Sequence, residues 1–257
     1  PQQEASIPPP APTEALPDTA EVAELNQDEP EVSDTPQVED KQSLTSTEQN
    51  AEQPADGDFV VEKFEQTLSP RQQAETLFKQ AQGDFERGLV AETIANLEQA
   101  LLLVDDYHEA RNLLAVAWYG RDETSTAINV LNKGVSRYPQ VELLRLTAAK
   151  IYFKRDNIAG AFSYLDLELE AASNEFYSMK ASLARQLNKY MVAEQAYLTL
   201  IKRQPNNASW WLGLAIVQDS QGIFSEAIFS YQQVLSLGGV SPQTRDFVQN
   251  RLAELKG

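Results

Sequence analysis

The chain has 257 residues, no cysteine, a single histidine and a formal net charge of −17 at pH 7. The lack of cysteine excludes a disulfide framework, a thiolate nucleophile and a cysteine-based metal site. No run approaches the roughly 20 apolar residues that a membrane-spanning helix needs, and no signal peptide is visible.

Residues 1–69 differ sharply in composition from the rest of the chain. They contain 17 acidic and 2 basic residues and nine of the thirteen prolines, and no aromatic residue precedes Phe59. Such a segment cannot bury enough apolar surface to offset the entropy of ordering, so residues 1–69 are predicted to form a disordered acidic linker rich in Pro, Glu and Gln. Because a linker normally connects two elements, we expect a signal peptide, a membrane anchor or another domain upstream of Pro1.

Residues 70–257 are nearly neutral, with 21 acidic and 19 basic residues, and are predicted to form one all-α domain. This balance does not indicate nucleic acid or an anionic bilayer as a partner. The domain begins at Ser69-Pro70 with Gln72 at the third helical position, which is typical of a helix capping box.

The domain carries a helix-pair pattern that repeats, in most copies, after about 34 residues. A small residue in each second helix marks one copy. Another small residue lies twelve positions earlier, and a large apolar residue lies four positions later on the same helical face, as packing between neighbouring helices requires. The markers are Thr93, Ala127, Ala161, Ala193 and Ala227; the earlier small residues are Ala81, Ala115, Ala149, Ala181 and Ala215; the large residues are Leu97, Leu131, Leu165, Tyr197 and Tyr231.

The predicted turns follow the same period. Each first helix is followed by Gly, Asn or Asp. Gly and Asn tolerate the left-handed backbone that commonly ends a helix, and Asp tolerates it less well. These residues are Gly88, Asp122, Asp156, Asn188 and Gly222. Pro139 and Pro205 end two of the second helices. The third copy is two residues short, between Ala161 and Ala193, which predicts a shorter second helix or a shorter following loop.

These signals predict five stacked helix pairs and a C-terminal capping helix. Ser241-Pro242 begins the last helix, whose apolar stripe would cover the exposed face of the fifth pair. The copies are predicted at about 74–107, 108–141, 142–173, 174–207 and 208–240, and the capping helix at 242–256.

The first helices of the pairs are predicted to line a concave groove. Lys150, Lys154 and Arg185 would form a small basic patch there, beside Tyr119 and Phe153. One interpretation is a groove that binds an extended or helical peptide through aromatic contacts and a carboxylate; the other is an ordinary solvated face. The candidate partner-binding residues are Asn112, Tyr119, Leu146, Lys150, Phe153, Lys154, Ser178, Arg185, Leu212 and Asp219.

Nothing in the sequence supports catalysis, a metal site or a cofactor. His108 is the single histidine, and without a second histidine or a cysteine it is predicted to pack at a turn or face solvent. Asp105 and Asp106 lack the spacing of a calcium loop and are predicted to form a solvated turn. Phosphate-binding loops and nucleophile elbows are absent from the sequence.

The repeat pattern resembles that of tetratricopeptide repeat (TPR) proteins over about residues 70–257, which implies an all-α, right-handed α-α superhelix. The clearest copy reads Trp211-x-x-Leu214-Ala215, then Gly222-x-Phe224, then Ala227-x-x-x-Tyr231. In the first copy Phe78 and Gln82 stand where chaperone-tail binders of the family have Lys and Asn, so a chaperone tail is not the expected ligand.

Within the TPR family, the whole layout resembles the MshN proteins of MSHA type IV pilus biogenesis. The resemblance lies in the acidic linker, in the run Leu68–Glu75 and in the stretch Asn206–Ala215. It implies a non-enzymatic scaffold that docks pilus-assembly proteins, in the periplasmic domain of a bacterial inner-membrane protein with an N-terminal anchor. The alternatives are an accessory TPR region of a longer enzyme, such as a transferase or cell-wall hydrolase, and a soluble cytoplasmic adaptor.

Overall fold

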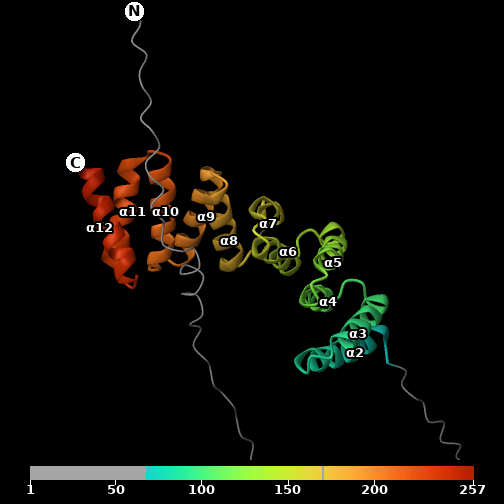
Figure 1. Ribbon diagram of the computed structural model, residues 1–257. Coiled ribbons are helices and arrows are strands. Elements are labelled where there is room, and N and C mark those ends of the chain that lie inside the picture. Colours follow the sequence, from blue (N-terminus) through green and yellow to red (C-terminus); the bar gives the residue numbers. More distant parts are fainter. Residues whose placement is uncertain (1–67, 170) are drawn as a thin grey trace, which may run out of the picture.

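The computed structural model describes residues 68–169 and 171–257. Within these ranges the regular structure is entirely helical, with five helix pairs and one final helix (Figure 1). None of these helices is long and apolar enough to cross a membrane. The predicted linker, apart from its last two residues, lies outside the described residues. The helices are α2 (Pro70–Glu86), α3 (Val90–Leu103), α4 (His108–Gly120), α5 (Thr124–Arg137), α6 (Glu142–Lys154), α7 (Ile158–Leu165), α8 (Asn174–Gln186), α9 (Tyr190–Arg203), α10 (Ala208–Ser220), α11 (Phe224–Leu237) and α12 (Pro242–Lys256).

Serine caps begin the first and last helices. Ser69 Oγ accepts a hydrogen bond from the Gln72 backbone N–H at 3.3 Å, and Gln72 Oε1 accepts one from the Ser69 N–H at 2.9 Å. This reciprocal arrangement confirms the predicted capping box. At the other end Ser241 Oγ accepts from the Thr244 N–H at 3.1 Å, so both caps satisfy N–H groups that a helix leaves unpaired.

The small residues of the repeat pattern lie at the helix crossings. All ten of them, from Ala81 to Ala227, have no exposed surface. A side chain of this size lets two helix backbones approach closely, and the large residue four positions after each marker fills the adjacent space. Gly213 shows the limit of this packing, because a Cβ there would overlap the Tyr197 ring of the preceding helix pair. The predicted packing positions are therefore confirmed.

All five predicted turn residues have a left-handed backbone. Their φ angles are 75° at Gly88, 64° at Asp122, 55° at Asp156, 58° at Asn188 and 73° at Gly222. Each follows the last residues of a first helix and reverses the chain into the second helix. The repeat period of the sequence thus predicted the left-handed turn residues as well as the packing positions of the helices.

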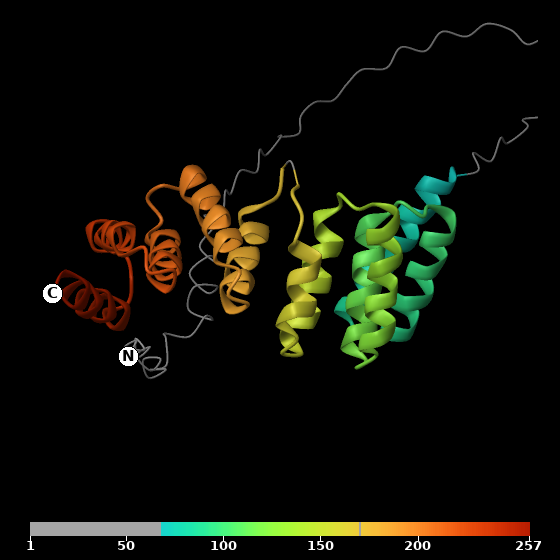
Figure 2. The same cartoon turned by 90° about the horizontal axis from the view of Figure 1, so that it is seen from above.

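The third helix pair departs from the others. Its second helix, α7, has 8 residues, whereas α3, α5, α9 and α11 have 14 each. The described residues of the connection that follows, 166–169 and 171–173, are nonhelical (Figure 2). The missing residues therefore shorten the second helix, and the connection to the next pair is longer than elsewhere.

Side chains of flanking helices bind the backbone around this irregular connection. Lys180 Nζ donates to the Leu167 carbonyl at 2.8 Å, and Arg203 Nη1 donates to the Ala172 carbonyl at 2.6 Å. Lys180 is itself buried, at 4% exposure, and also pairs with Glu168 at 3.1 Å. These bonds satisfy backbone carbonyl groups of a connection that has no helical hydrogen-bond pattern of its own.

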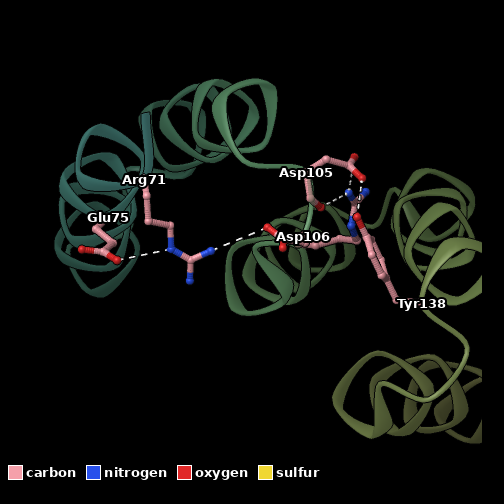
Figure 3. A network of polar contacts seen from close by, with 6 residues as sticks. Arg71, Glu75, Asp105, Asp106 and Tyr138 are labelled. Atoms are coloured by element: carbon pink, nitrogen blue, oxygen red, sulfur yellow. Dashed lines mark hydrogen bonds and ion pairs between the residues drawn. The ribbon is translucent and has the colours of Figure 1, made fainter. Parts of the chain in front are cut away.

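The exposed turn between the first two pairs also connects these pairs through side-chain contacts. Arg71 of α2 pairs with Asp106 at 3.6 Å, and Arg111 of α4 pairs with Asp105 at 2.9 Å (Figure 3). Tyr138 also donates a hydrogen bond to Asp105, at 3.1 Å. The turn is solvated as predicted, since the Asp106 side chain is 62% exposed, and its two carboxylates in addition join the first helix pair to the second.

Burial raises the pKa of Asp105, but the hydrogen bond from Tyr138 and the charges of Arg111 and Arg137 outweigh this effect. The pKa of the carboxyl therefore lies below its ordinary value. Asp105 is thus held in the charged form that its basic partners require.

Candidate functional site

The first helices of the pairs form a continuous layer on the inner side of the array. In Figure 1 the array forms an arc, with α4 and α6 nearer its inner side than α5 and α7. Thr147 Oγ1 of α6 donates to Asn112 Oδ1 of α4 at 2.6 Å, and Lys150 of α6 forms an ion pair with Glu175 of α8. The first helices of the second, third and fourth pairs therefore contact each other directly, as a groove-lining layer must.

Two of the predicted groove residues do not reach the surface. Leu146 and Leu212 are only 7% and 6% exposed and belong to the apolar core. They lie three residues before Ala149 and Ala215, a position that faces the neighbouring helices in these two copies. In the fourth copy the same position is Ser178, which donates to the Glu175 carbonyl of its own helix at 3.0 Å. Leu146 and Leu212 are packing residues, and we remove them from the candidate surface.

The predicted basic patch is smaller than its three residues indicate. Lys150 is neutralised by Glu175, whereas Lys154 is exposed at the end of α6. Burial raises the pKa of the Tyr197 hydroxyl, and the nearby Arg185 guanidinium only partly offsets this effect. Arg185 is thus half-buried beside the core, Lys150 is exposed but paired, and Lys154 is exposed.

Asp219 anchors the last helix instead of lining an open groove. Its carboxylate accepts hydrogen bonds from Arg251 of α12 at 2.7 Å through both oxygens, and one from the Tyr231 hydroxyl at 3.1 Å. The hydrogen bonds to Asp219 raise the pKa of Arg251, although burial acts against it. A bidentate pair of this kind is among the stronger side-chain contacts in proteins, so Asp219 is a structural residue.

In the first three helix pairs, an aromatic side chain occupies the same repeat position of the first helix. The residues are Phe85, Tyr119 and Phe153, each four positions after a buried alanine, and we call them the aromatic row. Phe85 is 37% exposed, Phe153 is 39% exposed and Tyr119 is half-buried. Phe85 was not among the predicted groove residues, although it precedes Tyr119 by one full repeat and the period could have identified it.

Comparisons with known proteins agree with this architecture. A family model described as tetratricopeptide repeat matches residues 178–242, which include most of the last two helix pairs. The structure is similar to that of Pseudomonas aeruginosa PilF, with a TM-score of 0.53 and 16% identity over 73% of this chain and 86% of that one. The fold is a TPR solenoid. This conclusion confirms the predicted fold class.

Two other solved TPR structures are similar. YrrB, described as a TPR protein with an unusual peptide-binding site, gives a TM-score of 0.55 at 12% identity, over 68% of this chain and 92% of that one. A TPR protein from Parabacteroides merdae gives a TM-score of 0.52 at 17% identity, over 72% of each chain. A comparison with curated protein sequences gave no match. At these identities the likeness concerns the fold alone.

The TPR array offers little that resembles a reaction centre. Among the described residues, no group of three or more His, Cys, Asp or Glu side chains is arranged to hold a metal ion. His108 packs edge-on against the Tyr138 ring, with 4.8 Å between centroids. Its place at the start of α4 confirms that it is a turn-packing histidine.

A second apolar feature lies between the last pairs of the TPR array. A hollow of about 450 Å³ opens between α9, α10 and α11, where the Trp211 and Phe229 rings meet edge-on with centroids 5.9 Å apart. Leu198 forms its third side, and Phe229 is 53% exposed. This hollow involves two second helices, so it is separate from the aromatic row.

Proposed function

We propose that this chain is a non-enzymatic scaffold that binds a segment of a partner protein along its layer of first helices. The observation that carries this proposal is the aromatic row: Phe85, Tyr119 and Phe153 recur with the period of the fold. Periodic rings on successive helices suit a ligand that runs along the array and contacts each pair in turn.

The energetics favour these rings as the main contacts. An exposed aromatic side chain that becomes covered contributes both apolar area, at about 25 cal/mol per Å², and favourable ring geometry. Lys154 follows Phe153 directly and is exposed, so a carboxylate of the partner would find a cation beside the last ring. The bound segment therefore has apolar side chains and at least one acidic group.

We further propose that the partner belongs to a type IV pilus of the MSHA kind or to a related secretion assembly. The support is the resemblance of the linker and of the stretch Asn206–Ala215 to MshN proteins, together with a TPR fold of the kind that binds peptides in YrrB. On this proposal the TPR domain acts in the periplasm, held at the inner membrane by an element upstream of Pro1.

The test is a binding measurement with purified components of the pilus assembly. The full chain would be immobilised as wild type, as the Phe153→Ser variant and as the Phe229→Ser variant, and each component passed over it. Both residues are exposed phenylalanines, but Phe229 lies on a second helix and serves as the matched control. We expect Phe153→Ser to weaken binding of one component about tenfold or more, as loss of a central aromatic contact does.

Two outcomes would overturn the proposal. One is that no pilus-assembly component binds the wild-type chain. The other is that Phe229→Ser weakens binding as much as Phe153→Ser while both variants keep the wild-type melting temperature.

A further inference from the structure

The first helix pair leaves an apolar strip uncovered on its groove side. Phe78 of α2 packs on Tyr107, with ring centroids 4.9 Å apart, and remains half-buried. Phe85 lies seven residues further along the same helix and is 37% exposed. Residues separated by seven share a helical face, so these two rings form one strip along α2. No helix pair precedes α2 among the described residues, so the strip lies at the start of the groove.

A segment of matching chemistry lies directly upstream in the sequence. Residues 1–67, which precede the described part, contain two aromatic side chains, Phe59 and Phe64, with Val60 and Val61 between them. This is the one place in an otherwise polar and proline-rich stretch where aromatic and β-branched apolar side chains cluster. It ends only a few residues before α2 begins.

The lengths permit this segment to reach the strip. Phe85 lies 15 residues beyond Pro70, which is about 22 Å along a helix. Phe59 precedes Pro70 by 11 residues, which span up to about 36 Å when extended. The difference leaves enough chain for a reversal at the start of α2, so Phe59 can lie against Phe85 and Phe64 nearer Phe78.

The charged residues beside Phe59 can be placed if the segment runs along α2 in this direction. Asp56 and Asp58 precede Phe59, so a segment that runs along α2 would carry them past Phe85 toward the ends of the neighbouring first helices. Those ends present the exposed cations Arg121 and Lys154, with the exposed carboxylate of Asp122 beside Arg121. Asp56 and Asp58 would therefore reach a mixed surface that offers them cations, while the apolar residues meet the aromatic rings.

We propose that Phe59–Phe64 folds back onto α2 of its own chain and covers Phe78 and Phe85. Resting on the proposed function, this docking has a regulatory consequence: the segment occupies the first part of the groove and competes with the partner. A tethered segment needs little intrinsic affinity to compete, because the short connection keeps its local concentration high.

The absence of native cysteines allows a direct test in the full chain. Val61→Cys would be combined with Gln82→Cys, which is exposed on α2 between Phe78 and Phe85. The control combines Val61→Cys with Ala95→Cys, exposed on α3. The Thr93 hydroxyl lies 3.5 Å from the Ala81 carbonyl, so Ala95 and Gln82 lie at similar distances along their helices and differ in the face that they present. Disulfide formation under mild oxidation would be followed by mass and by migration on non-reducing gels.

We expect the Val61–Gln82 pair to form an intramolecular disulfide about tenfold faster than the Val61–Ala95 pair, which corresponds to about 1.4 kcal/mol. Adding Phe59→Ser and Phe64→Ser should remove this advantage. Equal rates for the two pairs, or an advantage that survives the serine substitutions, would overturn the proposal. Predominantly intermolecular disulfides would also overturn it, in favour of a second copy as the occupant.

The partner measurement separates this inference from the proposed function. If both hold, Phe59→Ser with Phe64→Ser should increase the affinity for the partner severalfold, because the competitor is lost. If the crosslink forms as expected and no pilus component binds, the docking stands and the proposed function fails. If a component binds with unchanged affinity in the serine variant, the regulatory consequence is wrong.

Discussion

Two junctions between helix pairs in this array are stabilised in different ways. At the junction of the third and fourth pairs, α7 ends early and flanking side chains bind backbone carbonyls of the irregular connection after it. At the junction of the fourth and fifth pairs, α9 is full length and packs directly on α10 through Trp210 and Gly213. The buried alanines are fully covered at both junctions.

The contrast between the two junctions indicates which parts of the repeat are indispensable. The crossing point of the two helices is retained in both pairs, with Ala149 and Ala161 in one and Ala215 and Ala227 in the other. The distal part of the second helix is replaceable, because lysine and arginine side chains can satisfy carbonyls of the connection that takes its place. Stability at the third junction therefore includes polar contacts to the backbone beside the buried Leu169, Ala172 and Phe176, whereas the fourth depends on close packing between two regular helices.

The largest expected effect is at the packed junction. Trp210 is 1% exposed and its Nε1 donates to Gln204 Oε1 at 3.0 Å. Trp210→Ala should reduce the free energy of unfolding by about 3–5 kcal/mol, because it leaves a large cavity. Urea denaturation followed by circular dichroism measures this loss. Trp210→Phe should retain part of the stability, and a loss below about 1 kcal/mol for alanine would show that the junction does not depend on packing.

The next largest loss of stability is expected at the same junction, where the Gly213 backbone approaches the Tyr197 ring. Gly213→Ala places a methyl group against the Tyr197 ring and should cost about 1–3 kcal/mol through overpacking. Thermal unfolding of the single variant and of Gly213→Ala with Tyr197→Leu would measure the coupling. The double variant should recover part of the loss; if it adds a further full penalty, the contact is not the cause.

A comparable but more local effect is expected at the polar junction. Lys180→Met keeps the side-chain length but removes the donor to the Leu167 carbonyl, and should cost about 1–2 kcal/mol. Hydrogen exchange should increase in the connection after α7 and remain unchanged around α10. Exchange that increases equally at both junctions would contradict their separate modes of stabilisation.

The smallest effects are expected at the turns of the third and fifth pairs. Gly222 and Asp156 both have a left-handed backbone, with φ angles of 73° and 55°. Gly222→Ala should lower stability by about 1 kcal/mol, whereas Asp156→Gly should be neutral or stabilising by a few tenths of a kcal/mol. The melting temperatures of the two variants measure these changes in stability. A lower melting temperature for Asp156→Gly would show that the aspartate side chain itself stabilises the turn.

The sequence predicted those features that repeat with the helix period. Small buried residues and left-handed turn residues depend on local geometry and recur in each helix pair, so one copy helps to interpret the next. Arg251 with Asp219 and Lys180 with Leu167 depend instead on two side chains or loops meeting once in the array. No period identifies such contacts, which is why Asp219 was assigned to the groove and the carbonyl contacts were not foreseen.

The predicted groove residues also divide into those that the repeat period identifies and those that it does not. Tyr119 and Phe153 follow from the repeat, and Phe85 would have followed from applying the period to the first copy. Leu146 and Leu212 share a repeat position with Asn112 and Ser178, and their apolar chemistry was the available sign that they belong to the core.

The contact between Arg251 and Asp219 bears on how the array loses its structure. Arg251 of α12 reaches past α11 to α10, so the last three helices are joined by a direct link as well as by their succession. A linear stack ordinarily frays from its ends, because the terminal helix has a neighbour on one side only. Here the C-terminal end is tied to the interior, whereas the irregular connection after α7 interrupts the regular packing midway. We expect gradual unfolding to leave α8 to α12 as the last intact block, with the groove of the first three pairs already lost.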